Sequence, residues 1–546
     1  MIDIPAQKPL KQLSVLIIDG QALSHDVIKS ALIELGVDQV KSAENAFFAL
    51  RLCETNHFDM VIVAFDVKSD KDGFNLLEEM KIKGYVTKRT SVIFLSADTS
   101  TALVNCVVEL QPTDFWVKPL DRLKVERRIL HILQIKNKLH KLHYCIDKGE
   151  YSTAIYYAER QLQDPALAQY YPQINRLIGE CLMHLFEFSE AEAFYKKLAE
   201  SYDYAWVQTN IVRSLLKQDK TEEGMALADT LLERHDTRFT TYDALAEYYI
   251  DKEEYAKGYE VIKKATQLAP RNIERNRKSL TLARLNHDRM GQYQATQNMA
   301  KFAKNSIHDS PEFRLNVVRS AIDLAATLGE ADANRLLART DKDIERLEAE
   351  FGNAREMKDE LSIIRARLCN VRSDKKQAEV IMKAHEDVRV TGSMEANLDK
   401  MKAFHELGMW EKSLEILDLL KDQIESDSFI GQVICEYLEQ ESKERRDIHY
   451  SPKELGDMAS VHYKNKRYKP AFQLLKQAMQ LSPANVNLAI SQLKVLAILA
   501  EEVGLDEEQS TSMAECRELL RSQPLNPSQQ TRYNEYIERI DKVKAA

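Results

Sequence analysis

The chain has 546 residues, 29% of them charged and 44% hydrophobic, and its formal net charge at neutral pH is −9. This balance gives no electrostatic reason to expect binding to DNA or RNA, and no stretch approaches the roughly 18 consecutive apolar residues of a membrane span. Gly (16 residues) and Pro (13 residues) are scarce, which favours a mostly helical protein of several domains.

The cysteine pattern and the start of the chain both indicate a cellular compartment. The 7 cysteines are scattered and never form a CxxC pair, which is typical of reduced thiols rather than of a disulfide or zinc framework. The opening sequence MIDIPAQKPLKQLS lacks the apolar core of a signal peptide. We therefore expect a cytoplasmic protein.

Strand and helix patterns alternate along the first 130 residues. Short apolar runs rich in β-branched residues predict strands, and apolar residues at helical spacing predict helices between several of them. The predicted strands are 14–18, 40–43, 60–64, 91–95 and 114–117. The predicted helices are 27–35, 46–54 and 74–83. This order predicts a doubly wound sheet of five parallel strands, in which functional groups gather at the carboxyl ends of the strands.

Polar residues stand at those carboxyl ends, in a pattern that resembles the response-regulator receiver domain over residues 12–132. Asp19 follows the first predicted strand, Ser96 ends the run LSAD after the fourth, and Lys118 precedes Pro119 in the run FWVKPLD after the fifth. The resemblance implies a flavodoxin-like fold in which carboxylates hold Mg²⁺ beside a phosphorylated aspartate. It also implies that the lysine pairs with the phosphoryl group and that the hydroxyl bonds to it.

Two positions depart from the receiver pattern. Gly20 replaces the second member of the acidic pair that follows the first strand. Counting forward from Phe58 and Asp59 places the phosphoacceptor position on Ala64. Counting back from Asp72 and Gly73 places this position on Phe65, or on Ala64 if the loop is longer by one residue. We therefore predict a degenerate pseudo-receiver that is not phosphorylated in the ordinary way.

Asp66 supports an alternative interpretation. As a displaced acceptor it would make the protein a phosphorelay response regulator, with Asp19 and Asp66 as ligands of Mg²⁺. Without such activity no cofactor is expected. In a third interpretation the polar residues are remnants of the fold, and Asp19 and Lys118 form a direct buried ion pair without any phosphate.

A second pattern follows a predicted linker helix at 120–143. The segment from Tyr242 to Pro270 has large and small residues at the positions of a tetratricopeptide repeat, which it resembles, and the segment 455–483 matches as well. Small residues let the two helices of such a hairpin approach, and large ones fill the space between hairpins. The residues at position 17 of the successive repeat units are Tyr151, Phe188, Thr221, Tyr255 and Tyr293, at spacings of 37, 33, 34 and 38 residues, and Trp410 marks a further weak unit.

The period is lost over residues 306–390. Charge-rich runs there predict longer, divergent helices, which could form a coiled hairpin that mediates self-association. We therefore predict four segments, and their order makes the fold class α/β followed by an all-α solenoid. The segments are a receiver-like domain at 1–132, repeats at 133–305, divergent helices at 306–390, and further repeats with a capping helix at 391–546.

These features predict a binding protein rather than an enzyme. The chain has no glycine-rich phosphate loop, GxSxG motif or HExxH motif. The leading hypothesis is a bacterial signalling adaptor, whose repeat surface holds a protein or peptide and whose receiver domain docks a partner or its own array. No nucleic acid or membrane partner is expected, and homo-oligomers could form through the receiver or the helices at 306–390.

Overall fold

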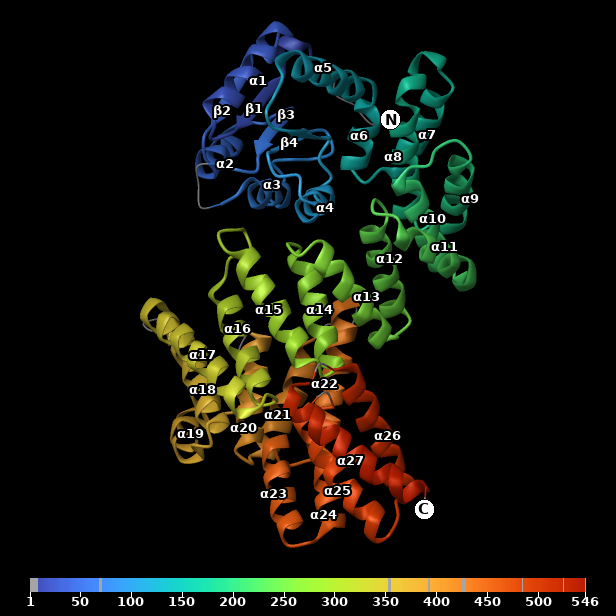
Figure 1. Ribbon diagram of the computed structural model, residues 1–546. Coiled ribbons are helices and arrows are strands. Elements are labelled where there is room, and N and C mark those ends of the chain that lie inside the picture. The colour runs from blue at the N-terminus through green and yellow to red at the C-terminus, as the bar shows by residue number, and fades with distance from the viewer. Residues whose placement is uncertain are drawn as a thin grey trace. The chain divides into compact units, whose positions relative to one another are not determined.

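The computed structural model divides the chain into two compact units, which are treated separately below (Figure 1). One unit holds residues 1–275 and 301–309, and the other holds residues 276–300 and 310–546. Their limits differ from the predicted segment boundaries at residues 132, 305 and 390, because the first helical hairpins pack together with the domain that precedes them. The structure describes residues 8–67, 71–351, 355–390, 393–424, 429–483, 485–523 and 525–545.

The first unit begins with the predicted sheet. Five parallel strands stand in the order β2-β1-β3-β4-β5, which confirms the predicted doubly wound arrangement. The strands are β1 Ser14–Ile18, β2 Gln39–Ala43, β3 Met60–Ala64, β4 Ser91–Ser96 and β5 Asp114–Val117. The helices of this domain are α1 Ala22–Glu34, α2 Ala46–Thr55, α3 Gly73–Ile82, α4 Thr101–Glu109 and α5 Arg122–Lys138.

The sheet has a hydrophobic core on each face, because successive residues of a strand point to opposite sides. In β3, Ile62 and Ala64 pack with α1 and α5, whereas Val61 and Val63 pack toward α2, α3 and α4. The second of these cores also contains Phe239 and Ala269 of the helical array, so it continues beyond the α/β domain.

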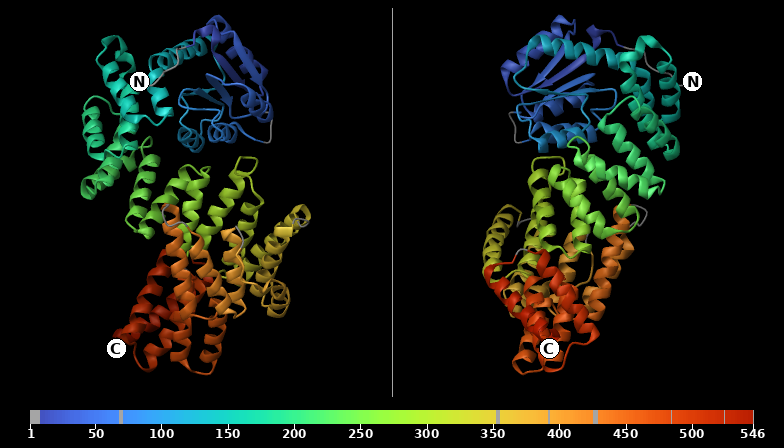
Figure 2. Two further views of the ribbon diagram at one scale, coloured as in Figure 1. Left: turned by 180° about the vertical axis from the view of Figure 1, so that it is seen from behind. Right: turned by 45° about the vertical axis from the view of Figure 1, so that its right-hand side comes forward.

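A helical array follows within the first unit. Its helices are α6 His140–Asp147, α7 Tyr151–Leu162, α8 Tyr171–His184, α9 Phe188–Ala199, α10 Ala205–Lys217, α11 Thr221–Glu233, α12 Arg238–Asp251 and α13 Tyr255–Leu268. They form successive hairpins that run around one side of the sheet domain (Figures 1 and 2). The single linker helix predicted at 120–143 is wrong: α5 ends at Lys138, and α6 begins at His140.

The hairpins share one turn. A residue in the left-handed region, with φ between 60° and 74°, stands two positions before the second helix of the first four hairpins. These residues are Gly149, Phe186, Asp219 and Glu253. His287, Ser373, Gly408 and Lys466 repeat the arrangement before α15, α19, α21 and α24. The predicted register at Tyr293 is therefore wrong: α15 begins at Arg289, 34 residues after Tyr255.

Helices are the regular secondary structure of the second unit in its described residues. Two helices, α14 Ile273–Leu285 and α15 Arg289–Ala303, contain residues of both units. The others are α16 Pro311–Ala325, α17 Glu330–Phe351, α18 Arg355–Val371, α19 Lys375–Met382, α20 Met394–Glu406, α21 Trp410–Gln423, α22 Phe429–Asp447, α23 Pro452–Lys464, α24 Tyr468–Leu481, α25 Val486–Glu502, α26 Glu507–Ser522 and α27 Pro527–Ala545. Helix α17 is the longest, with 22 residues. No helix in the described part of the chain is long and apolar enough to cross a membrane.

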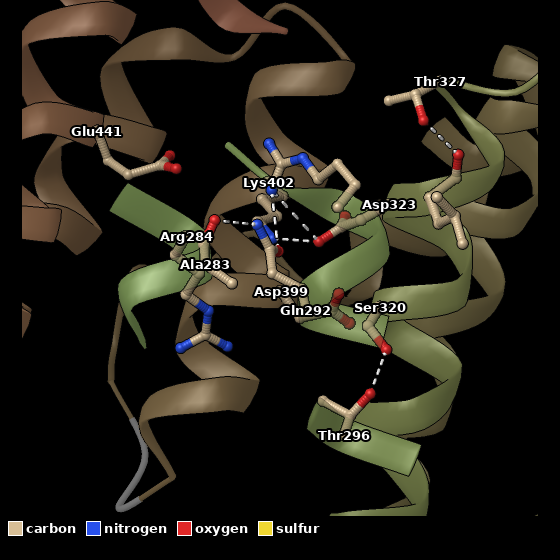
Figure 3. A network of polar contacts seen from close by, with 12 residues as sticks. Ala283, Arg284, Gln292, Thr296, Ser320, Asp323, Thr327, Asp399, Lys402 and Glu441 are labelled. Atoms are coloured by element: carbon tan, nitrogen blue, oxygen red, sulfur yellow. Dashed lines mark hydrogen bonds and ion pairs between the residues drawn. The ribbon is translucent and has the colours of Figure 1, made fainter. Parts of the chain in front are cut away.

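Buried ion pairs hold the helices of the second unit together. Arg367 of α18 lies 2.7 Å from a carboxylate oxygen of Asp323 (α16) and of Asp399 (α20), and 2.6 Å from Glu406. Lys402 of α20 also contacts Asp323, toward which its side chain points in Figure 3. A buried charge is stable only when it is paired, so these contacts specify how α16, α18 and α20 pack.

Candidate functional site

The structure brings together two of the predicted residues at the carboxyl edge of the sheet. Lys118, after β5, places its Nζ atom 2.8 Å from the Oδ2 atom of Asp19, after β1. The same ammonium lies 3.2 Å from the side-chain oxygen of Gln21, whose backbone N–H donates to Asp19. Both charged side chains are buried. The direct ion pair considered from the sequence is therefore present, and Gln21 is a partner that the sequence did not indicate.

The predicted acceptor position holds a methyl group. Ala64 is the last residue of β3, lies opposite Leu95 of β4 and is fully buried. The chain closes tightly around it: the Gly73 N–H donates to the carbonyl of Phe65, and a Cβ atom built on Gly73 would lie 1.9 Å from the carbonyl oxygen of Ala64. Glycine is thus required at the start of α3.

Substituting Gly73→Ala should destabilise the α/β domain. Because the atom in the way belongs to the backbone, α3 must move, and we expect the free energy of unfolding to fall by about 3 kcal/mol. Gly456→Ala in α23 is the control, since its added methyl would meet only Leu488 at 3.5 Å. Chemical denaturation of both variants checks this, and equal stability of the two variants would contradict the close packing.

Ser96 and Asp66 also lie near the carboxyl edge of the sheet, but Ser96 is buried and Asp66 is exposed. The Ser96 hydroxyl is buried and accepts a hydrogen bond from the backbone N–H of Asp98, which fixes the turn after β4. Asp66 lies two residues beyond the end of β3 and is exposed. In the described residues it makes no ion pair with Lys118, whose partners are Asp19 and Gln21.

The residues at this edge do not fit the Mg²⁺ site that the receiver pattern implies. Mg²⁺ prefers carboxylate and carbonyl oxygens in octahedral geometry. Gly20 and Ala64 bring no side-chain oxygen, and the carboxylate of Asp19 is already paired with Lys118. Over the described residues, no three His, Cys, Asp or Glu side chains are placed to hold a metal ion.

A second functional feature is the contact between the α/β domain and the array, which centres on Arg275. This buried side chain donates to both carboxylate oxygens of Asp243 in α12, at 2.9 and 2.7 Å, and also contacts Glu109 of α4. Its guanidinium carbon lies 4.7 Å from the ring centre of Phe239. One arginine therefore ties α4 of the α/β domain to a helix of the array.

Arg271 and its neighbours extend this contact. Arg271 lies 2.7 Å from Asp72, the N-cap residue of α3, and its guanidinium stands over the ring of Phe65 after β3. The Asn105 amide of α4 donates to the carbonyl of Leu268 at 3.3 Å. Polar and aromatic contacts thus connect the β3–α3 region with the end of α13.

The opposite edge of the domain contacts the array through Lys88 and Arg89, between α3 and β4. The backbone N–H of Lys88 and the side chain of Arg89 both donate to Asp147 of α6 at 2.9 Å, and the Lys88 ammonium lies 3.1 Å from Glu180 of α8. Helices α6, α8 and α12 are the first helices of their hairpins. We call the face that these three helices form the inner face, and the α/β domain occupies it.

Comparison with known proteins agrees with this fold for the first part of the chain. The family described as response regulator receiver domain matches residues 15–130. A probable chemotaxis protein CheY of Rhizobium etli is 27% identical over 119 residues, which are 22% of this chain and 91% of that protein.

Two solved structures also match this part of the chain. A chemotaxis response regulator of Vibrio cholerae has 19% identity and a TM-score of 0.21, over 22% of this chain and 98% of its own. A Francisella receiver domain has 25% identity and a TM-score of 0.20, over the same shares of the two chains. The sheet order, the family match and the Asp19–Lys118 pair at the strand ends lead to one conclusion: residues 15–130 are a response regulator receiver domain.

Proposed function

We propose that this protein is a bacterial signalling adaptor, without catalytic activity or cofactor, that binds a protein partner through an array of tetratricopeptide type in the cytoplasm. Its receiver domain acts in this proposal without phosphorylation. The observation that carries the proposal is Ala64 at the end of β3. A methyl group cannot form an acyl phosphate, and the backbone around it is closed by Gly73.

The surrounding charges support the same proposal. Lys118, which would pair with a phosphoryl group, is already engaged by Asp19 and Gln21. The Ser96 hydroxyl is bonded within its own turn. The receiver domain instead uses α4 and the residues before β4 to contact its own array, as a docking module would.

Labelling with acetyl phosphate tests the proposal. The full chain, incubated with Mg²⁺ and radiolabelled acetyl phosphate, should incorporate no label, and beryllofluoride should leave its thermal unfolding unchanged. A receiver domain with an intact acidic pair and acceptor aspartate, treated in parallel, shows that the reagents work. Stoichiometric labelling of this chain would overturn the proposal that its receiver domain acts without phosphorylation.

The alternative function is a phosphorelay response regulator that is switched at Asp66. Its support is the exposure of Asp66 close to the end of β3, where a phosphodonor could reach it. The variant Asp66→Asn separates the two functions: label that is incorporated by the natural chain and lost in this variant would establish the alternative. Label that persists in the variant would place the modification elsewhere.

A further inference from the structure

A cavity of about 400 Å³ lies in the first unit, between the receiver domain and the inner face of the array. The receiver contributes the end of α3 and the residues that precede β4 and β5, and the array contributes α6 and α8. These are the amino ends of the strands, so the cavity is at the opposite edge of the sheet from Ala64. Its size falls within the range of small-ligand sites.

Positive charge predominates in the lining. Three cationic side chains, Lys81, Lys88 and Arg176, face a single carboxylate, that of Glu180. Glu180 is shared, because Lys88 lies 3.1 Å from one of its oxygens and the Arg176 Nε atom lies 3.3 Å from the other. Lys81 donates to a backbone carbonyl, that of Leu110. Burial, followed by the charge of the nearby Lys88 ammonium, lowers the pKa of Lys81 to about 8.

Two buried polar atoms of the lining have no hydrogen-bond partner. They are the Nδ1 atom of His143 in α6 and the Oε1 atom of Gln173 in α8. Burial, followed by the charge of Lys136, lowers the pKa of His143 to about 4, so its imidazole is neutral near pH 7. Buried polar atoms are rarely left unpaired, and both of these lie where a bound molecule would contact them.

We propose that this cavity binds a small anion carrying two negative charges, either a phosphate group or a dicarboxylate. Such a ligand receives charge-assisted hydrogen bonds from Lys81, Lys88 and Arg176, and His143 can donate to it in the tautomer that carries its proton on Nδ1. The Oε1 atom of Gln173 accepts only, so its partner is a ligand hydroxyl such as the P–OH group of hydrogenphosphate. Because the cations come from both the receiver and α8, the ligand bridges the two and strengthens their contact.

Calorimetric titration of the full chain tests the proposal. The titrations are done at low ionic strength with inorganic phosphate and with malonate as probes, and chloride is the reference ion. The two probes distinguish a phosphate site from a dicarboxylate site. Arg176→Gln should weaken binding about tenfold, since one charge-assisted contact is lost. Glu180→Gln should have the opposite effect and tighten it, because the only carboxylate of the lining is removed.

Two further variants complete the experiment. Lys197→Gln, at an exposed position of α9 outside the cavity, should leave binding unchanged. Gln173→Leu removes an acceptor from the lining without changing its charge and should weaken binding of phosphate, whose P–OH group can donate to Oε1, more than binding of malonate. The melting temperature of each variant without ligand reports whether it folds. Absence of binding by both probes at millimolar concentration, or equal affinities in Arg176→Gln, Glu180→Gln and the natural chain, would overturn the proposal.

Discussion

Replacing Arg367 by alanine is expected to lower the free energy of unfolding of the second unit by about 3–5 kcal/mol. Its side chain is 3% exposed and contacts Asp323 of α16 and both Asp399 and Glu406 of α20. Without it, buried carboxylates lose their partner while remaining out of water. The exposed pair of Arg314 with Glu350 is the matched control, and Arg314→Ala should cost about 1 kcal/mol or less.

The same substitution should change the pH dependence of stability. Burial alone would raise the pKa of the Asp323 carboxyl, but Lys402, Arg367 and Arg289 together hold it well below its usual range. A lowered pKa in the folded state contributes stability above the unfolded value of about 4, and this contribution is lost as the pH falls toward the folded value. In Arg367→Ala the pKa of Asp323 rises toward the unfolded value, so this carboxyl contributes less stability near pH 7 and the loss on acidification is smaller and is complete at a higher pH.

Denaturation midpoints of the full chain between pH 2 and pH 7 measure both effects, and hydrogen exchange in α16, α18 and α20 assigns them to the second unit. Parallel pH profiles for Arg367→Ala and the natural chain would contradict a shared ion network. A loss of stability in Arg367→Ala that is no larger than the loss in Arg314→Ala would also contradict a shared ion network.

Replacing Arg275 by alanine is the second large expected effect. It removes the contacts with Asp243 and Glu109 and leaves Glu109, whose pKa burial already raises, without its arginine. We expect the first unit to lose about 3 kcal/mol of stability. Amide protons of α4 and α12 should exchange faster, because the receiver domain is freed from the inner face at that edge.

Arg234, which is about one-third exposed and pairs with Asp203 and Asp236 in the same unit, supplies the control variant Arg234→Ala. A double-mutant cycle that combines Arg275→Ala with Glu109→Gln separates the loss of the contact between Arg275 and α4 from the loss of the contact between Arg275 and Asp243. If Arg275→Ala changes exchange in α12 alone, Arg275 stabilises the array without holding the receiver domain.

The strands and the Asp19–Lys118 pair could be predicted from the sequence because both depend on local pattern. Buried parallel strands are continuous apolar runs, and the ends of such strands meet at one edge. Helix α4 was not predicted: its segment TALVNCVVE is rich in β-branched residues, and Ser100 at its N-cap makes no side-chain cap.

Docking of the receiver domain on its own array was one of the two alternatives that the sequence suggested, but the residues of that contact and the repeat turn could not be predicted. A left-handed residue favours glycine, yet Phe186, Asp219 and Glu253 adopt this conformation, because the packing of each hairpin outweighs the local cost. Arg271 and Arg275 look like ordinary surface residues in the sequence. Their partners Asp72 and Glu109 stand 199 and 166 positions away along the chain, and only the fold brings them together.

Occupation of the inner face by the receiver domain makes that domain an internal competitor. Any molecule that recognises α6, α8 or α12 can bind only the fraction of chains in which the receiver has moved away. If the attached state is favoured by about 3 kcal/mol, the apparent affinity for such a molecule falls about 150-fold. A change that removes this preference completely, through Arg275 and the other contacts, raises that affinity by the same factor.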